Sequence, residues 1–244
     1  MADQVVRTGE ADLCFEAFGD PGAPLVLLIM GLGLDLLWWR EDFCTRLAAR
    51  GFRVVRFDNR DVGRSTAFRG PGVGPWQLLT RRPHAPYALG DMADDAAGLI
   101  AALGDDAAHV VGVSLGALIA QEVALRHPDR IRSLVSIMGR PGDRRSGRVT
   151  WRGRLEFLRP PAGDPVEAMV ATFRRIGSAG RTQVDDDDVR TLMRASARRE
   201  QGDGTGPGRQ LAAILTERDR TADLRRLALP ALVVHGGRDR VIAP

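Results

Sequence analysis

A serine stands at a sharp turn between a strand-like segment and a helical pattern. Ser114 lies at the centre of Gly-Val-Ser-Leu-Gly (residues 112–116), which follows the strand-like residues 109–111 and precedes the helix-forming stretch 117–125. Glycines two positions before and after the serine permit the turn, because a Cβ at either position would collide with the neighbouring strand or helix. A hydroxyl held out by such a turn can attack a carbonyl once a base removes its proton. The pattern predicts Ser114 as a nucleophile; the alternative is a turn serine without chemistry.

The segments around this turn predict an α/β fold. We expect strands over residues 25–30, 52–57, 109–111, 131–138 and 231–235, alternating with helices over 39–50, 89–103 and 117–125. Such alternation favours a mostly parallel sheet with helices on both faces.

One stretch interrupts the alternation. From residue 140 to residue 228 no strand pattern is found, and helical patterns cover 164–176, 185–200 and 209–227. We expect a helical cap inserted before the last strand, over the active end of the sheet. The predicted organisation is a core over residues 1–139, a cap over 140–228 and a continuation of the core over 229–244.

Arginine supplies all of the basic charge. The 244 residues contain 35 arginines, no lysine and 31 acidic residues, with a net charge of +4 and 44% hydrophobic residues, which suits one soluble α/β domain. Most arginines alternate with acids. One cluster with few opposing acids could bind phosphate or nucleic acid, but no aromatic interleaving or zinc spacing accompanies it, so we expect a solvated loop and no nucleic-acid partner. Its members are Arg140, Arg144, Arg145, Arg148, Arg152 and Arg154.

Three further patterns bear on location and metals. Cys14 and Cys44 have no motif spacing, so free buried thiols are favoured over a disulfide. The N-terminus lacks the apolar segment of a signal peptide, and the longest apolar run is too short to cross a bilayer. We expect a cytoplasmic protein without a membrane partner. The four aspartates at 185–188 could bind a cation, but a helix N-terminus explains them better.

Four segments, in this order, resemble the α/β-hydrolase-fold family. They are the loop after the first apolar strand (27–33), the Asp-x-Arg-x-x-Gly turn within 57–65, the serine turn (112–116) and the strand and loop at 233–239. Together with residues 87–93, they look most like small-ester hydrolases of the aclacinomycin methylesterase type. The resemblance covers nearly the whole chain.

The resemblance implies a role for each segment. Ser114 would attack a small-molecule carboxylic ester and form an acyl-enzyme, without a cofactor or a metal. The backbone N–H groups of Leu32 and Leu115 would stabilise the oxyanion. Asp239 would be the acid of a catalytic triad, although an aspartate in a glycine-rich loop is usually a turn former. Met30 stands where relatives often carry histidine, a departure that leaves the backbone donor intact.

Other activities also occur on this fold. A perhydrolase or haloperoxidase without a cofactor stays open as an alternative. Haloalkane dehalogenases and epoxide hydrolases are disfavoured, because they need an aspartate where Ser114 stands. Trp38, Trp39, Phe157 and Phe173 could line a substrate pocket or pack the core, and membership of the fold does not choose among esters.

The histidine of the triad is missing from its usual place. In this fold it follows the acid, and only five residues follow Asp239. His109 is about 16 Å from Ser114 along one strand. His127 lies at the far end of the next helix, and His235 precedes the acid in a position that is not catalytic in the family. His84 alone is in a loop at the active end of the sheet.

We therefore expect this chain to be a C-terminally truncated form of a longer protein that carries the histidine. The alternative is an inactive member of the fold that binds a small molecule. The truncation would also leave the strand at 231–235 as a bare edge with uncovered apolar surface, so we expect a poorly soluble or self-associating chain.

Overall fold

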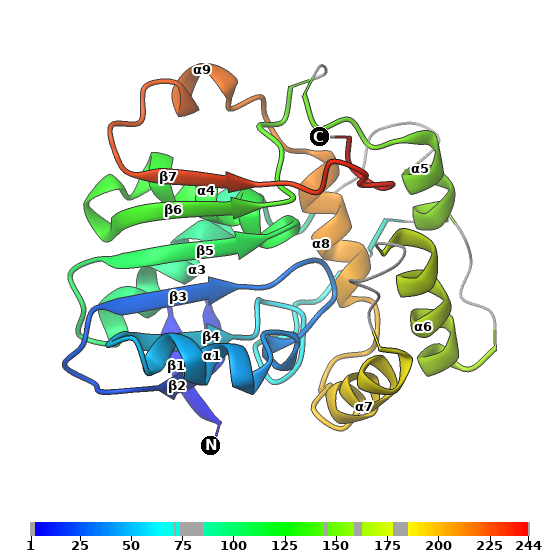
Figure 1. The fold of residues 1–244 in the computed structure, drawn as a ribbon, viewed down its shortest axis with the longest axis horizontal. Helices are drawn as coiled ribbons and strands as arrows, with labels where there is room; N and C mark the ends of the chain where they lie inside the picture. The colour runs from blue at the N-terminus through cyan, green and yellow to red at the C-terminus, as the bar shows by residue number, and fades with distance from the viewer. Residues whose placement is uncertain are drawn as a thin grey trace.

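A seven-stranded sheet crosses the described part of the molecule in the order β1-β2-β4-β3-β5-β6-β7 (Figure 1). β3, β4, β5, β6 and β7 pair in parallel, and β1 and β2 are antiparallel. The prediction of a mostly parallel sheet is confirmed. The strands are β1 (Gln4–Thr8), β2 (Ala11–Phe18), β3 (Leu25–Ile29), β4 (Arg53–Phe57), β5 (Ala108–Val113), β6 (Ile131–Ile137) and β7 (Ala231–Val234).

The computed structural model describes residues 3–70, 72–73, 85–143, 146–158, 163–177 and 185–243, without the side chains of Arg154, Phe157 and Leu158. The candidate base His84 and two members of the arginine cluster, Arg144 and Arg145, lie outside these residues. Among the strands, the sequence patterns locate β3 to β7 to within a few residues at their ends.

The hairpin of β1 and β2 was not predicted. Thr8 pairs with Ala11, so the loop consists of Gly9 and Glu10, and Gly9 has a φ of +58°. A residue with positive φ suits the tight turn of a two-residue hairpin. The glycine between two strand-forming segments was the available signal.

Helices cover both faces of the sheet. Leu25, Leu27 and Ile29 of β3 belong to the apolar cluster that includes α3 (Leu89–Ala102) and α4 (Leu115–Arg126). Val26 and Leu28 belong to the opposite cluster, with Cys44 of α1 (Glu41–Ala48). Successive strand residues point to opposite faces, so a strand buried on both sides must be apolar throughout. All five residues of β3 are buried, which explains its continuous apolar sequence.

In the part of the chain that the structure describes, five helices lie between β6 and β7. In Figure 1 the arrowheads of the parallel strands point toward α5, α6, α7 and α8, whereas α9 lies near α4. The helices are α5 (Trp151–Leu158), α6 (Pro165–Ile176), α7 (Asp186–Ala197), α8 (Gly206–Leu215) and α9 (Thr221–Leu224).

The single helix expected over 209–227 is two helices. α8 ends at Leu215, and Arg220 before α9 is fully buried, with its guanidinium paired with Glu217 and Glu122. These contacts accompany the break between the two helices, which the helical pattern over 209–227 did not reveal.

The aspartates at 185–188 are explained by the start of α7. Asp185 is the N-cap, and its carboxylate accepts the N–H of Asp187. Asp186, Asp187 and Asp188 pair with Arg174, Arg190 and Arg40, respectively. Acidic residues at this end of a helix interact favourably with its dipole. The structure thus supports the helix N-terminus over a cation site.

Cys14 and Cys44 are free and buried, as expected. Burial raises the pKa of the Cys14 thiol to about 12 and that of Cys44 to about 11. Both thiols therefore stay protonated and unreactive near neutral pH. Within the described residues, no helix is both long and apolar enough to span a bilayer.

β7 is an edge strand with exposed apolar side chains. Leu232, Val233 and Val234 are 56%, 72% and 44% exposed. Among the described strands β7 pairs only with β6, so its other edge presents backbone groups that could pair with another strand.

We predict that the 244-residue chain self-associates through β7, because association buries this apolar surface. Val233→Lys should shift the chain toward monomer, as measured by light scattering coupled to size-exclusion chromatography. Val5→Lys is the matched control, because Val5 is 61% exposed on the opposite edge strand. A wild-type chain that stays monomeric at high concentration would contradict the prediction.

Candidate active site

Ser114 occupies the turn between β5 and α4 in a conformation rare for a residue with a side chain. Its φ is +54° and its ψ is −118°. Such a backbone costs on the order of 1–3 kcal/mol and persists only when the surroundings impose it. Here the Ser114 N–H donates to the Ile137 carbonyl at 2.8 Å, and the Ser114 carbonyl accepts the N–H of Ala117 at 2.9 Å. The sequence pattern predicted this turn correctly.

The glycines on either side of Ser114 are required by close backbone contacts. A Cβ on Gly112 would lie 2.0 Å from the Gly116 carbonyl oxygen, and a Cβ on Gly116 would lie 2.1 Å from that of Ile29. Neither contact is sterically possible for a side chain. The start of α4 therefore touches both its own strand, β5, and the end of β3.

The loop after β3 lies against the serine. A Cβ on Gly31 would lie 3.4 Å from the Ser114 Cβ and 3.9 Å from its Oγ. Leu115 is the first residue of α4, where an amide has no helical acceptor. In the described part of the chain, neither the Leu32 N–H nor the Leu115 N–H has a hydrogen-bond acceptor. The structure thus brings Ser114 together with both predicted oxyanion donors, and both donors are free.

Long-range hydrogen bonds brace this loop. The Asn59 amide donates to the Met30 carbonyl at 3.0 Å, and the Leu36 N–H donates to Asp58 at 2.7 Å. The Gly33 N–H donates to the Gln210 side chain of α8 at 2.8 Å. Asn59 and Asp58 belong to the turn after β4 that the resemblance singled out. Sequence reasoning missed the contribution of Gln210.

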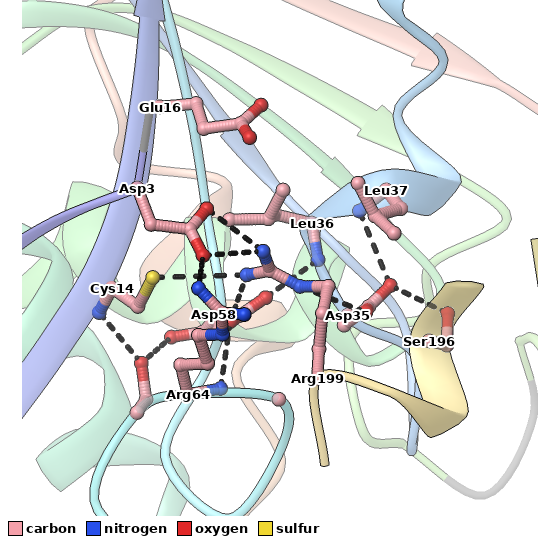
Figure 2. Close-up of polar contacts among 12 residues, drawn as sticks. Asp3, Cys14, Glu16, Asp35, Leu36, Leu37, Asp58, Arg64, Ser196 and Arg199 are labelled. Atoms are coloured by element: carbon pink, nitrogen blue, oxygen red, sulfur yellow. Dashed lines mark hydrogen bonds and ion pairs between the residues drawn. The ribbon is translucent and has the colours of Figure 1, made fainter. Parts of the chain in front are cut away.

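A buried arginine connects α7 to the same region (Figure 2). Arg199 follows α7 and is 7% exposed. Its guanidinium donates to Asp58 at 2.7 Å and to both oxygens of Asp3 at 2.7 Å, and its Nε lies 3.3 Å from Asp35. Asp35 also accepts a hydrogen bond from Ser196 of α7 at 3.0 Å. One cation thus ties α7 to the N-terminus and to the segments after β3 and β4.

The carboxylates of this cluster compete for one guanidinium. Burial, together with the negative charge of Asp58, raises the pKa of Asp35 to about 6. Burial also raises the pKa of Asp58, despite its hydrogen bonds from Arg64 and Leu36 and its pairing with Arg199.

Asp239 lies in the loop after β7 and is turned toward that loop. Its Oδ1 accepts the N–H groups of Val241 at 2.7 Å and Ile242 at 3.0 Å. Its Oδ2 lies 3.3 Å from Nε2 of His235, which also lies 3.1 Å from the Ile242 carbonyl oxygen. Two backbone donors fix the carboxylate through Oδ1. The other oxygen, Oδ2, is the one that could bind a further imidazole, and it faces His235.

The three described histidines are engaged away from Ser114. Nδ1 of His109 lies 2.8 Å from the Ser133 hydroxyl, and Nε2 of His127 lies 2.7 Å from Asp94. His235 contacts Asp239, as above. Among the described residues, none of these imidazoles forms a hydrogen bond with Ser114, in agreement with the sequence analysis.

The aromatic side chains near the site pack on one another. Trp38 stacks on Phe173 of α6 with ring centroids 5.1 Å apart, and Trp39 stacks on Phe43 at 5.5 Å. The first contact joins the segment after β3 to the inserted helices, which favours packing over an open pocket wall.

In the arginine cluster, Arg140 pairs with Glu217, and the Arg152 guanidinium lies over the Trp151 ring.

Comparison with known proteins identifies the family to which this chain belongs. A family model described as the alpha/beta hydrolase fold matches residues 24–244. Rhodomycin D methylesterase DauP of Streptomyces sp. (strain C5) is 37% identical over 139 residues, which are 57% of this chain and 43% of that protein. Rhodomycin D methylesterase DnrP of Streptomyces peucetius is 36% identical over 141 residues, or 57% and 43% of the two chains. The match thus spans less than half the length of these relatives.

A solved structure extends the similarity to the whole fold. A hydrolase from Pseudomonas aeruginosa PA01 superposes with a TM-score of 0.69 at 25% identity, over 99% of this chain and 82% of that one.

The Asp35 cluster should make stability depend on pH. Because the pKa of Asp35 is about 6 in the folded protein and near 4 in an unfolded chain, the folded state binds its proton more tightly. Folding stability should then fall as pH rises from about 4 to about 6, by at most on the order of 3 kcal/mol. Asp35→Asn should remove this part of the decline in the free energy of unfolding, measured by denaturant titration at each pH.

Asp129→Asn is the control, because it removes a carboxylate that is 79% exposed. Identical pH profiles for the wild type and Asp35→Asn would contradict the prediction.

Proposed function

Because the chain belongs to the alpha/beta hydrolase fold family, we propose that it is a cofactor-free serine hydrolase that cleaves a small-molecule carboxylic ester. The observation that carries the proposal is Ser114, held at positive φ beside two backbone amides that have no acceptor within the described residues. Strained backbone clusters at functional sites, and unpaired donors beside a serine suit attack on a carbonyl.

In the proposed reaction, the Ser114 Oγ attacks the ester carbonyl carbon while a base takes its proton. The carbonyl oxygen becomes an oxyanion and accepts the N–H groups of Leu32 and Leu115. A donor of this kind lowers the barrier by roughly 3–4 kcal/mol in a comparable hydrolase. The C–O bond of the ester then breaks, the alcohol leaves with the proton from the base, and the acyl group stays on Ser114. Water releases the acid by the same steps.

Asp239 is the proposed acid of the triad. Its role would be to orient an imidazole and to stabilise the charged form of that ring. The two amides that bind its Oδ1 hold the carboxylate in one orientation, as such a role needs. The contact of Oδ2 with His235 would have to be shared with, or yield to, the catalytic imidazole.

The base is sought outside the described residues. Within the described residues, His109, His127 and His235 have other partners. The base would be an imidazole that reaches both the Ser114 Oγ and the Asp239 carboxylate.

The names of the two relatives described above, both methylesterases, support the proposed class of substrate. We propose a small ester that binds between Ser114 and residues 140–228, which would act as a cap. The free thiols of Cys14 and Cys44 fit a reducing compartment, so the proposed location is the cytoplasm.

A binding protein without catalysis is the second candidate. It is favoured by one observation: in the described part of the chain, no imidazole reaches Ser114.

Ser114→Ala should abolish covalent labelling by a fluorophosphonate and lower ester hydrolysis by on the order of 10⁶-fold, since loss of the nucleophile in serine hydrolases has about this effect. Labelling is measured by intact mass and hydrolysis with p-nitrophenyl acetate. Ser133→Ala, on β6 beside His109, is the matched control and should label normally. A wild-type protein that resists labelling would favour the binding-protein alternative.

The source of the base can be tested on the protein as its natural host produces it. Each histidine of the host-produced protein, His84 among them, is replaced by alanine in turn. We expect one of these variants to lose fluorophosphonate labelling at Ser114, because the base that activates the serine is gone. If every histidine variant labels as the wild type does, the base is not a histidine and the proposed mechanism is contradicted.

A further inference from the structure

The first half of α8 is buried against the loops that surround Ser114. Gly206 allows this approach, because a Cβ there would lie 2.1 Å from the Asp61 carbonyl oxygen. On the other side, a Cβ on Gly33 would lie 3.2 Å from the Pro207 ring. α8 thus contacts the turn after β4 and the loop after β3 together. Figure 1 places it at the carboxyl ends of the strands.

An ion pair fixes the position of α8. Arg209 is 1% exposed and donates to both oxygens of Asp61, at 2.9 and 2.8 Å. Tyr87 also donates to Asp61, at 2.6 Å. A two-point contact between a guanidinium and a carboxylate defines orientation as well as distance. The residue after Arg209 is therefore presented to the site in a defined orientation.

That residue, Gln210, is fully buried and uses both ends of its amide. Its Oε1 accepts the Gly33 N–H at 2.8 Å, and its Nε2 donates to the Arg60 carbonyl at 2.8 Å. No other side chain in the described residues binds the Gly33 amide. Because the donor and the acceptor are on separate loops, the side chain has only one orientation that satisfies both.

The Gly33 amide is the next one along the chain from the proposed oxyanion donor, Leu32. On the other side of Leu32, the Gly31 carbonyl accepts the N–H of Leu34 at 3.3 Å. The two peptide groups that flank the Leu32 Cα are thus held separately, one by the local turn and one by Gln210. Without Gln210, the partly buried Gly33 N–H would lose its acceptor, and the Leu32–Gly33 peptide group could rotate to find another.

We infer that Gln210 is a positioning residue that holds the Leu32 N–H in the orientation needed to bind the oxyanion. The inference rests on the proposed function and deepens it. Gln210 lies 177 residues along the chain from Gly33, so a distant helix, α8, becomes part of the support of the oxyanion site. Gln210 does not touch the substrate; it acts through the loop backbone.

The test compares two buried glutamines in the protein as its host produces it. Gln210→Met keeps the length of the side chain and removes both hydrogen bonds. Gln121→Met is the matched control: Gln121 is 6% exposed, donates to Ser136 and accepts from Arg220, and within the described residues it forms no hydrogen bond with the loop after β3. Both variants should lower the melting temperature, since each leaves buried partners unsatisfied.

Only Gln210→Met should impair catalysis. With p-nitrophenyl acetate we expect kcat to fall about 10- to 100-fold with KM changed less than about threefold, because a misplaced donor weakens binding of the transition state and not of the ester. Affinity for a trifluoromethyl ketone, which forms an oxyanion on the serine, should fall in parallel. Gln121→Met should keep kcat within about twofold.

Gln210→Glu provides a second measurement if the methionine variant does not fold. A protonated glutamic acid can accept from Gly33 and donate to Arg60, whereas a carboxylate can only accept. Activity relative to wild type should therefore be highest at low pH and fall as the carboxyl ionises. A kcat of Gln210→Met equal to wild type, or equal losses in both methionine variants, would overturn the inference while leaving the proposed function intact. Failure of the wild-type protein to label at Ser114 would overturn both.

Discussion

The backbone contact at Gly112 and Gly116 is the constraint on which the rest of the site depends. A Cβ on either residue would lie only 2.0 or 2.1 Å from a carbonyl oxygen, so only glycine lets α4 begin directly above its own strand and against the end of β3. This contact fixes β3 beside β5 in the sheet and puts the loop after β3 next to the serine. It also accounts for the positive φ of Ser114, since the chain has no room for a wider turn. The positions of the proposed nucleophile and of its two candidate oxyanion donors follow from one steric condition.

The helices inserted between β6 and β7 are attached to the same region by buried polar contacts. Arg199 joins α7 to Asp58 and Asp35, and Arg209 and Gln210 join α8 to Asp61 and Gly33. Buried ion pairs add little net stability, because desolvation of the charges offsets their attraction. Hydrogen bonds and ion pairs nevertheless require specific distances and angles, whereas apolar contacts are non-directional and would permit several positions of these helices. We interpret these contacts as the means by which the inserted segment is held in register with the loops around Ser114.

The local features of the fold were predictable from the sequence, and the pairings between distant segments were not. The apolar runs of β3 to β7 and the glycines around Ser114 are patterns within a few residues, so periodicity and turn chemistry reveal them. The hairpin of β1 and β2 and helix α5 gave weaker local patterns and were missed. The bond between Gly33 and Gln210 joins residues 177 apart, and nothing in either segment marks the other as its partner. The pairing of Asp239 with His235 likewise depends on how the last loop folds back.

The central claim is that Ser114 attacks a carbonyl whose oxygen then binds the amides of Leu32 and Leu115. The most direct measurement is a crystal structure of the host-produced protein after reaction with a fluorophosphonate. The account predicts phosphorus on the Ser114 Oγ, with one phosphoryl oxygen about 2.7–3.1 Å from the nitrogens of both Leu32 and Leu115. The same structure would identify the histidine that serves as the base. Phosphorus on another residue, or a phosphoryl oxygen directed away from both amides, would contradict the account.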